Sequence, residues 1–168
     1  MKIGTIRRID DLGRIVVPKS IRKTLRIKSG DNLEIFIEGE NIILRKYSEL
    51  NKIIDIETTV AKVLKETLKS DVLITDKDKY ILTLGNTKQK YLNQEISDDL
   101  LEILENRQMI IQGKNNVLDT QTENIVINPI IINGDVIGSI IITTKEKIDE
   151  NIIKILTTLT TFLVKHIE

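Results

Sequence analysis

The 168-residue sequence contains no cysteine and no tryptophan, and it has one histidine and two prolines. Without cysteine the chain forms no disulfide and no thiolate metal site, which fits a reducing cytosol. With a single histidine, no cysteine and no pairing of a nucleophile with a base, the sequence argues against an enzyme. No catalytic residue, metal or tightly held cofactor is expected. His166 is expected on the surface of a C-terminal helix.

The sequence also lacks long hydrophobic runs. The N-terminus is charged from Lys2 onward and has no apolar core of a signal peptide. The longest apolar stretches, such as residues 125–132, are interrupted by Asn and Pro and are too short to span a bilayer. These absences predict a cytoplasmic protein with no membrane partner.

Charge of one sign gathers at the start of the chain, although the net charge of the whole sequence is zero. Residues 1–28 hold nine Lys/Arg against two acidic residues, Asp10 and Asp11. Such a local excess favours a polyanionic partner, and nucleic acid is the first candidate. A run of basic residues can also be only a solvated face, and this alternative stays open for Lys19 and Arg26, which flank a predicted helix. No aromatic residue interrupts the run, so duplex DNA is favoured over single strands.

The basic run lies on a pattern of short elements. Residues 3–9 and 15–17 are expected as strands on either side of an Asp-Asp-Leu-Gly turn, and residues 20–25 as a short helix after Pro18. Residues 33–37 and 42–45 predict two more strands. Capping of turns accounts for Asp10, Asp11 and Asp31 better than a metal cluster does. Fewer than 50 residues bury too little surface to fold alone, so a dimer with interdigitated strands is expected.

Two helices are expected to flank the second half of the chain. Residues 50–69 and 149–167 carry apolar side chains at helical spacing, and Asp149 is a plausible N-cap. Helices from two subunits are expected to form a four-helix bundle. The residues predicted to mediate oligomerisation are Ile53, Val60, Leu64, Leu156, Leu159 and Leu163.

Between the two helices the pattern predicts an antiparallel sheet. Strands are expected over 72–75, 80–84 and 109–112, with a helix over 97–106 capped by Ser97. Asn133-Gly134 between two apolar runs is a strong hairpin signal, and Pro129 in the first run indicates an edge position or a bulge.

These residues carry two resemblances. RRIDDLGRIVVPKSIRKTLRIKSGDNLEIFIEGENIILRKYS resembles the swapped-hairpin DNA-binding module of the AbrB transition-state regulators. ENIVINPIIINGDVIGSIII resembles part of a GAF domain. The order of the two resembles regulators of gene expression during sporulation, acting as activators and repressors. The resemblance implies that six basic residues face double-stranded DNA: Arg7, Arg8, Arg14, Lys19, Arg22 and Lys23. It also implies that the protein lies on the nucleoid.

The expected fold class is therefore α+β, with an N-terminal dimeric swapped-hairpin barrel followed by a GAF-like α/β domain. The expected boundaries are 1–48 for the DNA-binding domain, 49–70 for a linker and bundle helix, and 71–168 for the regulatory domain. The resemblance to GAF domains also implies a small effector, whose identity stays open. Its pocket would involve Tyr80, Thr83 and Tyr91, although tyrosine is as often only half-buried packing.

Sequence readout is expected to be loose. Arginine dominates the basic set, and Asn and Gln are absent from residues 1–31, which favours recognition of DNA shape over a base code. Association is expected as a homodimer or a dimer of dimers. A protein-interaction module stays open as the alternative, because the same small fold resembles antitoxins that bind a toxin and bind DNA only secondarily.

Overall fold

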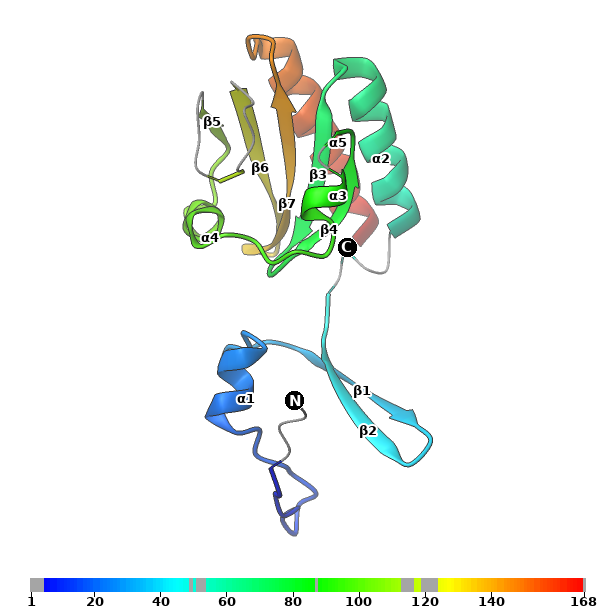
Figure 1. The fold of residues 1–168 in the computed structure, drawn as a ribbon, viewed down its shortest axis with the longest axis vertical. Helices are drawn as coiled ribbons and strands as arrows, with labels where there is room; N and C mark the ends of the chain where they lie inside the picture. Colours follow the sequence, from blue (N-terminus) through cyan, green and yellow to red (C-terminus); the bar gives the residue numbers. More distant parts are fainter. Residues whose placement is uncertain are drawn as a thin grey trace. The chain divides into compact units, whose positions relative to one another are not determined.

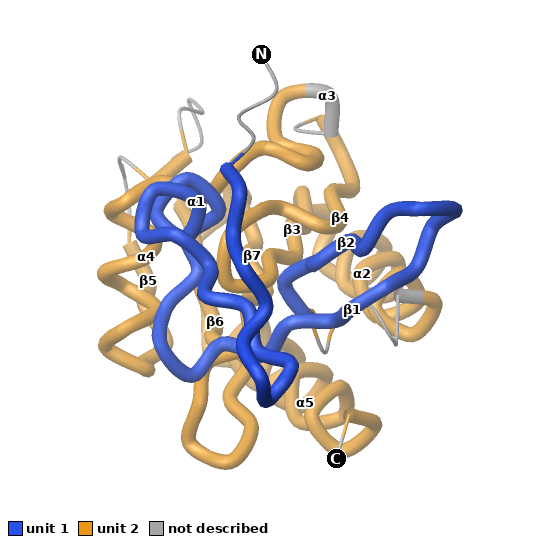
Figure 2. Tube along the Cα trace, turned by 90° about the horizontal axis from the view of Figure 1, so that it is seen from below, with its two compact units in different colours: residues 1–47 blue, residues 48–168 orange. Residues whose placement is uncertain are grey.

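A computed structural model describes residues 5–48, 50, 54–86, 88–112, 117–118 and 124–167. Backbone contacts divide the chain into unit 1, residues 1–47, and unit 2, residues 48–168 (Figure 2). Unit 1 contains α1 (Lys19–Thr24) and a hairpin of β1 (Leu33–Glu38) and β2 (Asn41–Lys46). The remaining elements form unit 2 (Figure 1).

Short-range chemistry explains the elements of unit 1. Pro18 precedes the first turn of α1, where its missing N–H removes no helical hydrogen bond. The helix ends at Thr24, and Arg26, two residues later, has a φ of 50° in the left-handed region. The Ile27 N–H then donates to the Arg22 carbonyl at 2.8 Å. Gly39, with φ of 59°, turns the chain between β1 and β2. The predicted helix and the two later strands are therefore present.

The two earlier predicted strands are absent from the single chain. No strand is assigned within residues 5–18, while residues 1–4 lie outside the described part of the chain. A strand needs a partner for its backbone groups, and one copy of unit 1 supplies none there. None of the residues from 5 to 47 is buried, and apolar side chains lie open, with Ile6 96% and Ile37 83% exposed. Leu25, directly after α1, is 52% exposed.

Unit 2 is a sheet with helices on both faces. The strand order is β4-β3-β7-β6-β5, and every neighbouring pair is antiparallel. The strands are β3 (Asp71–Asp76), β4 (Tyr80–Leu84), β5 (Ile110–Gln112), β6 (Asn124–Ile132) and β7 (Asp135–Thr144). The helices are α2 (Ile54–Leu68), α3 (Lys88–Tyr91), α4 (Asp98–Glu105) and α5 (Glu150–Ile167). None of the helices in the described ranges has the length and hydrophobicity to cross a membrane.

The sequence predicts the β6–β7 hairpin, and the structure contains it. Asn133 and Gly134 both have positive φ, 50° and 83°, as a two-residue hairpin loop requires. Pro129 lies beyond Ile127, the last residue of β6 that pairs with β5, and a register shift follows between Ile130 and Ile131. The proline therefore occupies a locally unpaired edge beside a bulge, where its missing N–H breaks no ladder.

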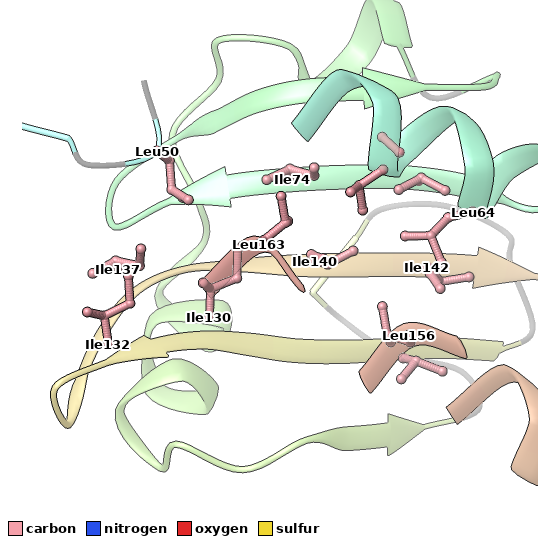
Figure 3. Packing of buried hydrophobic residues seen from close by; sticks show 14 residues of the cluster. Leu50, Leu64, Ile74, Ile130, Ile132, Ile137, Ile140, Ile142, Leu156 and Leu163 are labelled. Atoms are coloured by element: carbon pink, nitrogen blue, oxygen red, sulfur yellow. The ribbon is translucent and has the colours of Figure 1, made fainter. Parts of the chain in front are cut away.

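Helices α2 and α5 cover one face of the sheet and bury its larger apolar cluster (Figure 3). Asp149 caps α5 by accepting from the Ile152 N–H at 2.9 Å. One polar link crosses this layer, where Asn128 Nδ2 of β6 donates to Thr160 Oγ1 of α5 at 2.8 Å. Glu57, on α2, also points into this layer and is 0% exposed.

The opposite face of the sheet is covered by α3, α4 and residues 117–118, which bury a second apolar cluster. Ser97 caps α4 by accepting from the Leu100 N–H at 3.2 Å, as predicted. Thr75 and Ser139, opposite each other on β3 and β7, hydrogen-bond through their hydroxyls at 2.8 Å beneath this cover.

Candidate nucleic-acid interface

The turn at residues 10–14 is organised by one carboxylate. Asp10 Oδ1 accepts from the Leu12 N–H at 3.0 Å and from the Arg14 N–H at 2.8 Å. Asp10 Oδ2 accepts from Arg14 Nε at 2.7 Å. Gly13, with φ of 75°, lets the chain reverse. The Arg14 backbone N–H and then its side chain lower the pKa of Asp10, so this carboxylate is ionised at neutral pH.

The other predicted DNA-contacting residues are exposed on the same unit. Arg7 and Arg8 lie in the extended segment before the turn, and Lys19, Arg22 and Lys23 lie on α1. Among the described residues, none of these five side chains forms an ion pair. Two acids of unit 1 pair with other basic residues, Glu34 with Arg45 at 2.9 Å and Asp31 with Lys46 at 3.3 Å. The basic set is therefore not neutralised within unit 1.

Described acidic residues of unit 1 hold turns and ion pairs. Asp31 Oδ2 accepts from the Lys28 N–H at 2.8 Å, so it caps a turn as Asp10 does. In the described ranges no group of three or more His, Cys, Asp or Glu side chains is arranged to hold a metal ion. His166 is exposed on the last turn of α5, and its Nδ1 contacts the Phe162 carbonyl at 2.9 Å.

The three residues predicted for an effector pocket lie together on the α3 and α4 side of the sheet. Tyr80, Thr83 and Tyr91 are all buried, and the two tyrosine rings stand 5.2 Å apart between centroids. The Tyr80 hydroxyl and Thr143 Oγ1 are buried without a hydrogen-bond partner among the described residues. Burial raises the pKa of Tyr80. Buried hydroxyls without partners are costly unless something else satisfies them.

The residues predicted for oligomerisation lie mostly in the core of unit 2. Val60, Leu64, Leu156 and Leu163 are buried in the cluster between the helices and the sheet (Figure 3). Their spacing is explained by packing within one chain, because an amphipathic helix buries its apolar stripe on its own sheet. Leu159 is half-buried, and Ile53 lies outside the described residues. The outer faces of α2 and α5 instead expose Val63 and Phe162, by 43% and 44%.

Comparison with known proteins decides the family. Residues 49–168 match the family described as stage V sporulation protein T C-terminal, transcription factor. Stage V sporulation protein T of Bacillus subtilis (strain 168) is 40% identical over 151 residues, covering 86% of this chain and 85% of that relative. The chain belongs to the stage V sporulation protein T family. The description of the matched family is that of a transcription factor.

The two halves have separate relatives within this family assignment. Residues 6–51 match the family described as antidote-toxin recognition MazE, bacterial antitoxin. The transition state regulatory protein AbrB of B. subtilis is 50% identical over 44 residues, or 26% of this chain and 46% of that relative. The cofactor-binding GAF domain of the nutrient sensor CodY from Clostridium difficile matches 71% of this chain and 96% of its own, with a TM-score of 0.51 at 17% identity. This member of the stage V sporulation protein T family thus joins an AbrB-type N-terminal domain to a GAF-like fold.

Two residues of interest escaped the sequence prediction. Asp10 was expected only to cap a turn, although its spacing of four residues from Arg14 also allows the ion pair that forms. Glu57 lies three residues from Val60, on the apolar stripe of α2, and this spacing was the available signal that it would be buried.

Proposed function

We propose that this protein is a DNA-binding transcription regulator that grips duplex DNA with a dimer of unit 1. The observation that supports this most is the set of five basic side chains without ion-pair partners among the described residues: Arg7, Arg8, Lys19, Arg22 and Lys23. Arg and Lys side chains contact phosphates, and arginine also fits the edge of guanine. In keeping with its family, its targets are genes of sporulation, with both activation and repression. Its place is the cytoplasm, on the nucleoid.

The lack of buried apolar surface in residues 5–47 supports dimerisation. A folded unit in water needs buried apolar surface, yet no residue from 5 to 47 is buried. A second copy would cover the open apolar side chains and pair the segments that lack strand partners. These side chains include Ile6, Ile9, Ile15, Val16, Ile35 and Ile37.

The salt dependence of DNA affinity tests this proposal. The double variant Arg22→Ala/Lys23→Ala removes two of the unpaired basic side chains of α1. We expect weaker binding to a mixed-sequence duplex. The slope of log K against log salt should become shallower by about 0.9 for each phosphate that the variant no longer neutralises.

The matched control is Lys62→Ala/Lys65→Ala, which removes the same charge from exposed positions of α2 in unit 2. The control should keep the wild-type slope. Equal slopes for both variants would contradict the assignment of the α1 surface to DNA.

We further propose that unit 2 binds a small effector on the α3 and α4 side of the sheet. Support comes from the buried Tyr80 hydroxyl and Thr143 Oγ1, which lack partners among the described residues, and from the GAF-like fold. A panel of nucleotides and free amino acids, screened by the melting temperature Tm of the whole protein, tests it. An effector should raise the Tm of the wild type by a few degrees, about 1 kcal/mol or more. It should not do so in Tyr80→Phe, and an equal shift in Tyr80→Phe would remove Tyr80 from the site.

An antitoxin-like module is the second candidate, supported by the antitoxin family match over residues 6–51. It requires a protein partner for unit 1 and only secondary affinity for DNA. Weak DNA binding that is insensitive to both salt and Arg22→Ala/Lys23→Ala would favour this candidate.

A further inference from the structure

We propose that Asp10 is a positioning residue, which holds Arg14 by its Nε so that the two terminal nitrogens form a fork for a guanine edge. The inference rests on the proposed DNA binding. It assigns to Asp10 and Arg14 a different task from that of the other basic residues. They would supply the preference for a base, whereas Arg7, Arg8, Arg22 and Lys23 would supply contacts to phosphates.

Hydrogen bonds to Asp10 hold both the main chain and the side chain of Arg14. Its N–H donates to Asp10 Oδ1 at 2.8 Å, and its carbonyl accepts from the Asp10 N–H at 3.1 Å. The Gly13 N–H donates to the Asp10 carbonyl at 2.9 Å, which closes the turn. The side chain is then held at Nε by Asp10 Oδ2 at 2.7 Å. A guanidinium held in this way loses less freedom when it binds than one on an unrestrained side chain.

The two terminal nitrogens of the Arg14 guanidinium suit a base edge. Arg14 has five N–H donors, and the contact at Nε leaves the two terminal nitrogens with their four. The Arg14 side chain is 70% exposed, so this end is open to a ligand. Two parallel N–H donors match guanine O6 and N7 in the major groove.

The charge of the Asp10–Arg14 pair favours a base edge over a phosphate as the ligand. Arg14 and Asp10 together are neutral, and a carboxylate this close to the guanidinium repels a phosphate. Guanine carries no net charge and suffers no such repulsion. Four residues, Arg7, Arg8, Arg22 and Lys23, have no acidic partner among the described residues, so they keep their full attraction for phosphate.

The alternative is that Asp10 only folds the turn, and the two carboxylate oxygens allow a clean test. Oδ1 serves the backbone N–H groups, and Oδ2 serves Arg14 Nε. Asp10→Asn keeps an oxygen for the turn and replaces the other by an NH₂ group, which cannot accept from Arg14. Asp11→Asn is the matched control, since it removes the same charge from the neighbouring exposed residue.

The experiment selects duplexes from a random pool with full-length wild type, Asp10→Asn, Asp11→Asn and Arg14→Ala. The wild type and Asp11→Asn should enrich the same guanine position within an otherwise loose pattern. Asp10→Asn and Arg14→Ala should lose it, with about a tenfold fall in preference for the selected duplex over one lacking that guanine. In a double-mutant cycle, Asp10→Asn should have no further effect on this preference once Arg14 is alanine.

Three outcomes would overturn the inference. They are a guanine preference kept by Asp10→Asn, a loss shared by Asp11→Asn, and additive effects of Asp10→Asn and Arg14→Ala. Thermal melting and the solution mass of each variant report a damaged fold separately. Arg22→Ala/Lys23→Ala on the same duplexes keeps the two proposals apart. If that variant weakens binding while Asp10→Asn changes no preference, DNA binding stands and only the role of Asp10 fails.

Discussion

Leu163→Lys is expected to unfold unit 2, whereas Phe162→Lys, one residue away, leaves it folded. Leu163 is 0% exposed and packs in the cluster between α5 and the sheet (Figure 3). A lysine there would bury a charge with no partner, or expose the cluster to water, at a cost of about 3–5 kcal/mol. That is a large fraction of the stability of a typical domain. Circular dichroism with thermal melting measures the loss.

Phe162→Lys is the matched control, because it places the same charge on the same turn of α5. Phe162 is 44% exposed and contacts the His166 ring with centroids 4.2 Å apart. We expect its melting curve to stay close to that of the wild type. Because the buried stripe of α5 packs within one chain, we propose that the predicted association of copies uses the outer faces of α2 and α5. The mass of Phe162→Lys in light scattering should then fall. A folded Leu163→Lys variant of reduced mass would instead place Leu163 at an interface, and an unchanged mass for Phe162→Lys would remove Phe162 from it.

Glu57→Gln is expected to stabilise unit 2 at neutral and alkaline pH. Glu57 is fully buried, and neither carboxylate oxygen has a hydrogen-bond partner among the described residues. Burial first, and then the nearby charge of Asp76, raise the pKa of Glu57 from 4.5 to about 8. Ionising this group in the folded state is therefore unfavourable. Glutamine has nearly the same shape and never ionises.

The pH dependence follows from the direction of the shift. The folded state holds the Glu57 proton more tightly than the unfolded state, so stability is complete below the unfolded pKa of 4.5. It falls as the pH rises through the folded pKa of about 8, and the loss is constant above that. Wild type and Glu57→Gln should melt together near pH 4, while near pH 9 the variant should be more stable by about 5 kcal/mol, or about 15 °C in Tm.

Glu66→Gln supplies the control for this experiment, because Glu66 is exposed on the same helix. Its melting temperature should follow that of the wild type at every pH. A constant difference between Glu57→Gln and the wild type from pH 4 to 9 would contradict a buried titrating carboxyl.

The features that were predicted correctly from the sequence are mostly set by interactions between residues close together in the chain. Asn133-Gly134 fixes the β6–β7 hairpin, and Ser97 and Asp149 begin their helices by accepting from backbone N–H groups three residues ahead. Each of these signals acts within a few residues, so it can be interpreted without knowledge of the fold. The AbrB-type motif similarly lies within one continuous stretch.

The predictions that a single chain does not reproduce involve features that depend on distant partners. Residues 3–9 and 15–17 were expected as strands, yet a strand needs a neighbour and one chain offers none in residues 5–18. The apolar stripes of α2 and α5, which contain Leu64 and Leu156, have the same spacing whether they face another subunit or their own sheet. Only the fold shows that they pack on their own sheet. The burial of Glu57 likewise depends on β3, which places Asp76 near α2.

The absence of any buried residue from 5 to 47 bears on how the protein responds to its own abundance. If each copy of unit 1 is completed only by another, then at low levels the amount of competent regulator grows with at least the square of the total concentration. Unpaired copies would meanwhile present open backbone to proteases. Target genes would then respond over a narrow range of dose, so that gradual accumulation of the protein becomes a timed, steep onset of regulation.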